Sequence, residues 1–100
     1  MGFWDDYEVV DQLDDAEGDY SWSCVGILRR LSDGALFWAA DGGCSCNGPW
    51  EDYSWRKQSG PDTPLTDETW PDLQAEAIST NAGKGAEWAN RVKQKYLLAA

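Results

Sequence analysis

The stretch VGILRRLSDGALFWAA, residues 25–40, decides the fold predicted from this sequence. Apolar runs flank Asp33-Gly34, and an Asp-Gly pair between such runs favours a tight hairpin turn with positive φ. We therefore predict two antiparallel strands, one over Tyr20 to Leu31 and the other over Ala35 to Ala40.

The predicted turn also fixes which residues face each other across the hairpin. A two-residue turn at Asp33-Gly34 pairs Ile27 with Ala40 and, continued outward, places Cys24 opposite Gly43. Gly43 directly precedes the Cys44-Ser45-Cys46 sequence. The predicted hairpin therefore brings all three cysteines together at its open end.

The longer of the two strands changes its apolar parity at Gly26. Trp22 and Cys24 share one parity of the period-two pattern, whereas Val25 and Ile27 occupy the other. The change predicts either a strand buried on both faces or a bulge at Gly26.

The flanking segments complete an α+β fold. Phe3 to Leu13 has a β-compatible centre, and its acidic residues favour an edge strand. Pro71 suits the first turn of a helix over Asp72 to Ser79, and a second helix runs from Gly83 or Lys84 to Leu98. We predict a small antiparallel sheet of about three strands covered by a C-terminal helix, in a single domain over residues 1–100, because 100 residues bury one modest core.

The chain is strongly acidic. Its 18 Asp and Glu residues outnumber 8 Lys and Arg residues, and it has no histidine. This charge argues against binding nucleic acid phosphates or an anionic membrane, and it favours partners with a basic surface. Internal complementarity between the acidic start and the basic last helix, simple solubility and mimicry of nucleic-acid charge are the alternatives.

Tryptophan is abundant, with seven residues in a chain of 100. Seven indoles exceed what a core of this size usually holds, so some are expected to lie partly exposed and to mark a contact surface. The alternative is that they only fill the core.

The sequence shows neither a signal peptide nor an apolar run of the ~20 residues that span a bilayer. Three cysteines, an odd number, fit a reducing compartment better than a disulfide framework. We therefore expect a soluble, cytoplasmic protein.

The loop from Asp41 to Tyr53 is the candidate site. Its two glycines, a Cys-x-Cys, an Asn-Gly-Pro turn and an aromatic residue with two carboxylates all have special backbone or side-chain properties. The predicted binding residues in and beside this loop are Trp50, Glu51, Asp52, Tyr53 and Trp55.

The same loop resembles a family of small proteins of unassigned function encoded by phages of actinobacteria. The matching residues are Asp33, Gly34, Phe37, Trp38, Asp41, Gly43, Cys44, Ser45, Cys46, Pro49, Trp50, Glu51 and Asp52. The resemblance covers about the central third of the chain. It implies a phage origin and expression in the host bacterial cytoplasm, and it supplies no activity.

The cysteines allow a second hypothesis, a small zinc-binding or thiol redox protein centred on Cys24, Cys44 and Cys46. Three thiolates are one ligand short of a closed tetrahedral zinc site, and Asp41 could complete it. A disulfide between Cys24 and Cys44 is another option in the predicted register. The alternative is that the thiols pack as small apolar groups.

Catalytic groups are lacking in the sequence. A cysteine nucleophile would have no histidine to activate it, and Glu51 and Asp52 are adjacent, so they point apart on an extended chain. We expect a protein that is not an enzyme and has no cofactor. The leading hypothesis is a phage-encoded protein-binding module that engages a host or phage protein through exposed tryptophans and carboxylates, near the loop and the acidic N-terminal segment.

Overall fold

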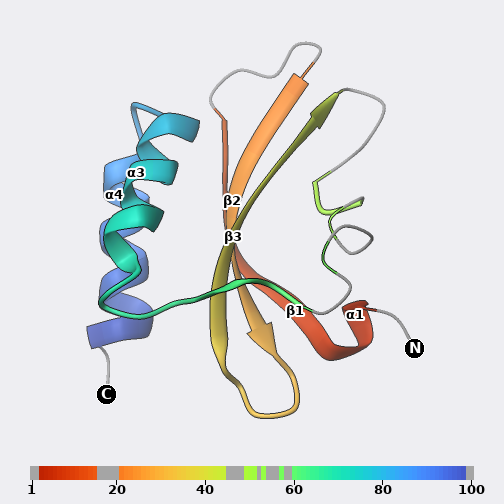
Figure 1. Ribbon diagram of the computed structural model, residues 1–100. Coiled ribbons are helices and arrows are strands. Elements are labelled where there is room, and N and C mark those ends of the chain that lie inside the picture. Colours follow the sequence, from red (N-terminus) through yellow and green to blue (C-terminus); the bar gives the residue numbers. More distant parts are fainter. Residues whose placement is uncertain are drawn as a thin grey trace.

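A computed structural model describes residues 3–15, 21–44, 49–51, 53, 57 and 60–98. The chain forms one antiparallel sheet with helices beside it (Figure 1). The strands are β1 (Tyr7–Asp14), β2 (Ser21–Arg30), β3 (Leu36–Cys44) and β4 (Thr63–Pro64), and the helices are α1 (Phe3–Asp6), α3 (Trp70–Thr80), α4 (Gly85–Val92) and the π-helix η1 (Lys93–Leu98). The predicted α+β class is confirmed.

Within the described residues the sheet has four strands in the order β1-β2-β3-β4, so the prediction of about three strands is wrong by one. The additional strand, β4, contains only Thr63 and Pro64, which pair with Trp38 and Phe37. β1 lies at the edge of the sheet, as its acidic residues predicted.

The hairpin at Asp33-Gly34 is confirmed, and its predicted register is wrong by two residues. The N–H of Arg30 donates to the carbonyl oxygen of Ala35 at 2.8 Å, so four residues, 31–34, form the turn. The Asp33 carboxylate accepts from Ala35 N at 3.1 Å and binds the Arg30 guanidinium, which stabilises this wider turn. Gly34 takes the predicted positive φ of 76°.

A shift of two residues keeps every side chain on its predicted face of the sheet while changing its partner. Cys24 pairs with Asp41 rather than with Gly43, and Cys44 pairs with Ser21. The backbone of Cys44 therefore lies three positions along β3 from the partner of Cys24.

Strand β2 forms the middle of the core. The five consecutive residues from Cys24 to Leu28 are all buried, which confirms a strand covered on both faces. Gly26 pairs regularly with Gln12 and Ala39, and the irregularity lies in β1 instead, between Val9 and Asp11.

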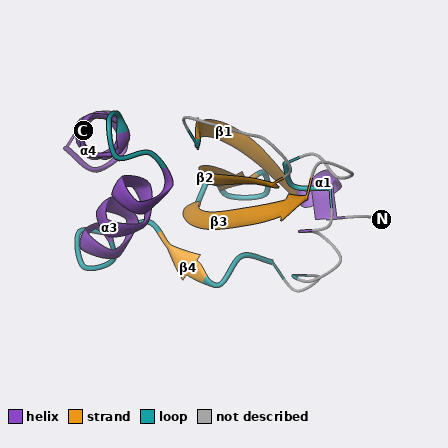
Figure 2. Cartoon of the chain, turned by 90° about the horizontal axis from the view of Figure 1, so that it is seen from above, coloured by secondary structure: helices purple, strands orange, loops and turns teal. Residues whose placement is uncertain are grey.

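Two apolar clusters lie on the two faces of the sheet. Val25 and Ile27 of β2 pack with Leu73 of α3 and Trp88 of α4, so the helix pair covers one face (Figure 2). The second cluster contains Cys24, Leu28, Ala39, Trp50 and Tyr53. Trp50 and Tyr53, together with Phe3 of α1, thus cover the face that α3 and α4 leave free.

Both predicted helices are present. α3 extends the predicted range by a few residues, with Pro71 in its first turn as expected. The second predicted helix appears as α4 followed by η1. Among the described residues, no helix is both long enough and apolar enough to cross a membrane.

Candidate binding surface

Trp50, the first predicted binding residue, is buried, with 6% of its surface exposed. Its backbone N–H donates to Asp41 Oδ2 at 2.8 Å, and its indole Nε1 donates to Gln12 Oε1 at 2.6 Å. These two bonds, together with a φ of 69°, direct the ring onto the sheet face that the helices leave uncovered. Trp50 therefore belongs to the tryptophans that fill the core and not to those that lie partly exposed.

Tyr53 is also buried, at 3% exposed. Its ring lies 5.3 Å from the Trp50 ring in an edge-to-face arrangement and 5.7 Å from that of Phe3. Glu51, between them, is exposed. The other two predicted binding residues, Asp52 and Trp55, lie outside the described residues.

Cys24 is 1% exposed and lies in the second apolar cluster. Burial, reinforced by the negative charges of Asp41 and Asp14, raises the pKa of its thiol to about 12. A thiol held neutral in this way is a weak nucleophile. Packing as a small apolar group accounts for its position.

Only part of the predicted cysteine cluster lies among the described residues. The side chain of Cys44, and Cys46 as a whole, lie outside the described part of the chain. Within the part that is described, no three His, Cys, Asp or Glu side chains are grouped as metal ligands would be. The zinc or redox hypothesis therefore stays a prediction.

An exposed apolar and acidic surface is formed instead by α1 and the β2–β3 turn. Leu31 N donates to the carbonyl oxygen of Asp6 at 2.8 Å, which joins the two elements. Trp4 is 41% exposed and Leu31 is 50% exposed, and both Asp5 and Asp6 are exposed. We call Trp4, Asp5, Asp6 and Leu31 the α1–turn surface.

The basic residues beside the α1–turn surface are bound to carboxylates of the same chain. Arg29 of β2 forms an ion pair with Glu8 of β1, and Arg30 binds Asp33 with a distance of 2.7 Å between Nη2 and Oδ2. The Arg30 guanidinium holds the pKa of Asp33 low, at about 2. The positive charges of Arg29 and Arg30 are therefore balanced by Glu8 and Asp33. Asp5 and Asp6 of α1 then give this end of the molecule additional negative charge.

Sequence reasoning found part of this surface. The acidic N-terminal segment belonged to the leading hypothesis, whereas Leu31 was assigned to a strand and its exposure was missed. A leucine directly before the turn-forming Ser32-Asp33-Gly34 was the available signal, because turn residues lie at the surface.

A hollow of about 630 Å³ lies between the end of β1 and the α3–α4 turn. Asp14 and Asp15 line it together with Lys84 and Arg91. The basic last helix therefore lies close to part of the acidic start, as internal complementarity predicted. Arg91 additionally pairs with Glu87 of its own helix at 3.2 Å.

One comparison was with models of known protein families. The model of a family described as Domain of unknown function (DUF7574) matches residues 4–95, which is nearly the whole chain. No curated protein and no solved structure matches the chain.

Proposed function

The chain belongs to the family of the domain of unknown function DUF7574, and we propose that it is a non-enzymatic module that binds a partner protein with a basic surface. The observation that carries the proposal is the α1–turn surface. There, an exposed indole and an exposed leucine lie on two elements joined by a backbone hydrogen bond and flanked by aspartates.

Exposed apolar side chains of this size usually contribute much of the affinity of a protein interface. Tryptophan in particular is enriched among interface residues whose truncation weakens binding strongly. The burial of Trp50 and Tyr53 removes two other candidates for this role, because a partner cannot reach them without displacing the segment. Among the described tryptophans, Trp4 is the exposed one, and it has this role in the proposal.

The charge of the chain defines the partner. A formal net charge of −10 attracts a basic surface over a distance and raises its association rate, an effect that salt screens. Asp5 and Asp6 place part of that charge directly beside the apolar contact. We expect lysine and arginine side chains of the partner to surround an apolar pocket that receives Trp4.

The setting of the interaction follows from the resemblance of the loop to proteins of actinobacterial phages. In this proposal the module is made in the bacterial cytoplasm during infection and binds a protein of the host or of the phage.

Affinity purification of the tagged protein from expressing actinobacterial cells tests the proposal. The wild-type chain is compared with Trp4→Ala and Leu31→Ser, and with Ile78→Ser and Leu98→Ser as matched controls. The control side chains are also large, apolar and exposed, at 42% and 62%, but they belong to α3 and η1.

A basic protein should be recovered in stoichiometric amount with the wild type and both controls, and should be lost with either variant of the α1–turn surface. Its affinity for the purified chain should fall as salt rises. Recovery that is equal with Trp4→Ala and with the controls, at equal melting temperatures, would exclude this surface as the binding site.

A further inference from the structure

The outer edge of β3 is paired for only part of its length. β4 pairs only with Phe37 and Trp38, because it begins at Thr63, the partner of Trp38. Continuing the same register places Pro61 opposite Ala40. Proline has no backbone N–H to donate, so the ladder cannot continue with this segment.

The backbone of β3 beyond Trp38 directs hydrogen-bonding groups toward this edge. In an antiparallel pair, the residues that bond to the neighbouring strand alternate with residues that point away from it. Arg30 and Ala35 form a bonded pair, so in the observed register Ala39 and Asp41 also face β2. Ala40 and Gly42 therefore point their N–H and C=O groups outward, and no strand in the described part of the chain meets them.

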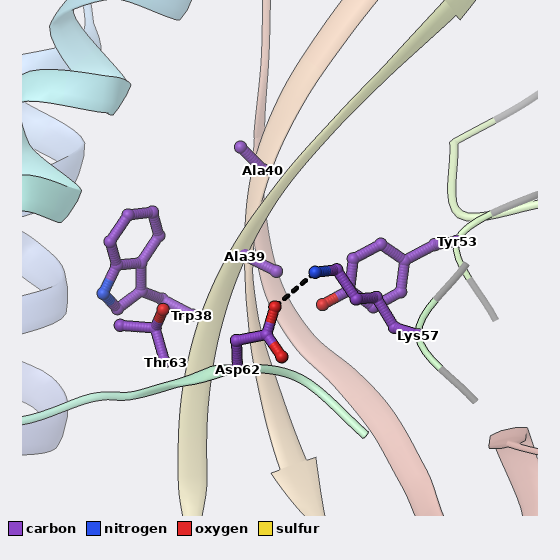
Figure 3. Close-up of a pocket in the computed structure, with 7 residues that line it drawn as sticks. All are labelled: Trp38, Ala39, Ala40, Tyr53, Lys57, Asp62 and Thr63. Atoms are coloured by element: carbon purple, nitrogen blue, oxygen red, sulfur yellow. Dashed lines mark hydrogen bonds and ion pairs between the residues drawn. The ribbon is translucent and has the colours of Figure 1, made fainter. Parts of the chain in front are cut away.

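A hollow of about 170 Å³ lies at the same edge, beside Thr63, where β4 begins. Figure 3 shows Trp38 on one side of β3 and Tyr53 on the other, with Asp62 and Lys57 facing each other between them. Asp62 and Lys57 form an ion pair. The indole N–H of Trp38 is buried and has no hydrogen-bond partner among the described residues.

The charge of the chain selects the occupant of this edge. A second copy could pair edge to edge, but each copy carries a formal net charge of −10, and the repulsion opposes that arrangement. A basic extended segment has the complementary charge. Its ammonium groups could reach Asp62, whose side chain is 66% exposed.

We propose that the outer edge of β3, from Ala39 to Gly43, binds an extended, lysine- or arginine-rich segment of a partner protein, which adds a strand to the sheet in line with β4. The outward N–H and C=O groups of Ala40 and Gly42 bond to its backbone, and the hollow between Trp38 and Tyr53 receives one of its side chains. This edge is separate from the α1–turn surface, so the proposal stands independently of that one.

Amide hydrogen exchange and titration with a defined peptide test the proposal. The probe is an acetylated and amidated peptide of four Lys-Val repeats, added to the full-length protein and followed by amide chemical shifts. In the free protein, the amides of Ala40 and Gly42 should exchange faster than those of Ala39 and Asp41. Bound peptide should slow the exchange of the first pair at least about tenfold, as a new backbone hydrogen bond does.

The variant Ala40→Pro removes one outward N–H and leaves the hydrogen bonds between β2 and β3 in place. It should therefore lower the affinity for the peptide by about tenfold. Ala40→Val keeps the N–H and is the matched control, with the melting temperatures of both variants recorded. Equal binding by folded Ala40→Pro and Ala40→Val would overturn the proposal. So would slow exchange of Ala40 and Gly42 in the free protein, peptide-induced shifts confined to other elements, or concentration-dependent dimerisation through this edge.

Discussion

The indole ring of Trp50 occupies the space that a side chain on Gly26 would need. A β-carbon built on Gly26 would lie 2.5 Å from Cζ2 of Trp50 and 3.3 Å from the carbonyl oxygen of Asp11. The absence of a side chain in the middle of β2 thus lets the indole of Trp50 pack directly onto the sheet. Gly26, where the sequence allowed a β-bulge, is instead the position against which the buried ring of Trp50 packs.

Replacement of Gly26 by alanine should therefore destabilise the protein. Either the indole or β1 must shift to admit the methyl group, and overpacking of this kind costs about 1–3 kcal/mol. Chemical denaturation followed by tryptophan fluorescence measures the change. Gly83→Ala is the matched control, because a β-carbon there would meet only Asn81 Oδ1 at an ordinary 3.7 Å. Equal stabilities of the two variants would contradict the packing described for Trp50.

The buried carboxylate of Asp41 fixes the backbone of the same segment. Its Oδ2 accepts the N–H of Trp50 at 2.8 Å across nine residues of sequence. Asp41→Ala should lower the free energy of unfolding by about 1–3 kcal/mol, because it leaves a buried donor unsatisfied. Asp41→Asn keeps an acceptor oxygen and should cost less. Thermal denaturation compares both variants with Glu68→Ala, which changes an exposed acid. Equal melting temperatures of all three variants would show that the Asp41 carboxylate does not hold the backbone at Trp50.

Local sequence signals predicted the elements of this fold well. The hairpin, the edge position of β1 and both helices follow from turn residues, charge and periodicity that each act within a few residues. The register between β2 and β3 could not be predicted from these local signals. It depends on the length of the turn, which is set by hydrogen bonds of the Asp33 carboxylate with the Arg30 guanidinium and the Ala35 N–H. β4 could not be found, since a strand of two residues has no periodicity.

The candidate site was harder to predict, because exposure is a tertiary property. Trp50 lies in a glycine-rich, polar stretch that resembles a surface loop. It is buried because Asp41, in the same loop, and Gln12 of β1 accept its two N–H groups, and Gly26 of β2 leaves room for its ring. The contributions of Gln12 and Gly26 come from outside the loop, so no pattern within it contains them. At α1, by contrast, the exposed indole of Trp4 lies next to exposed Asp5 and Asp6 in the sequence.

The C-terminal helices are joined to the edge strand through the carboxylate of Asp11. Its Oδ1 accepts from Trp88 Nε1 at 3.1 Å, and its Oδ2 accepts from Tyr96 Oη at 3.3 Å. Asp11→Ala should destabilise the protein by about 1–3 kcal/mol, since the buried indole N–H then lacks an acceptor. Tyr96→Phe removes only the longer hydrogen bond, from Tyr96 Oη to Asp11, and should lower the free energy of unfolding by less.

Urea denaturation of these two variants, with Asp67→Ala as an exposed acidic control, measures the effect of the Asp11 carboxylate. A stability for Asp11→Ala equal to that of the control would show that the carboxylate does not hold the helices.

The buried thiol of Cys24 should make stability depend on pH in the alkaline range. Its pKa is raised from 9.0 to about 12 in the folded protein, so folding favours the neutral thiol. The resulting stability is fully present below pH 9.0 and is lost as the pH rises toward about 12.

Melting temperatures between pH 8 and 11 test this in the background Cys44→Ser, Cys46→Ser, where Cys24 is the only thiol. Addition of Cys24→Ala is the control, because lysine and tyrosine titrate equally in both proteins. The parent should lose more stability than the control above pH 9.0, and a disulfide reagent should modify it at pH 8 only once denaturant is added. Rapid modification of the folded parent would show instead that Cys24 is accessible and ionised, as a metal or redox centre would need.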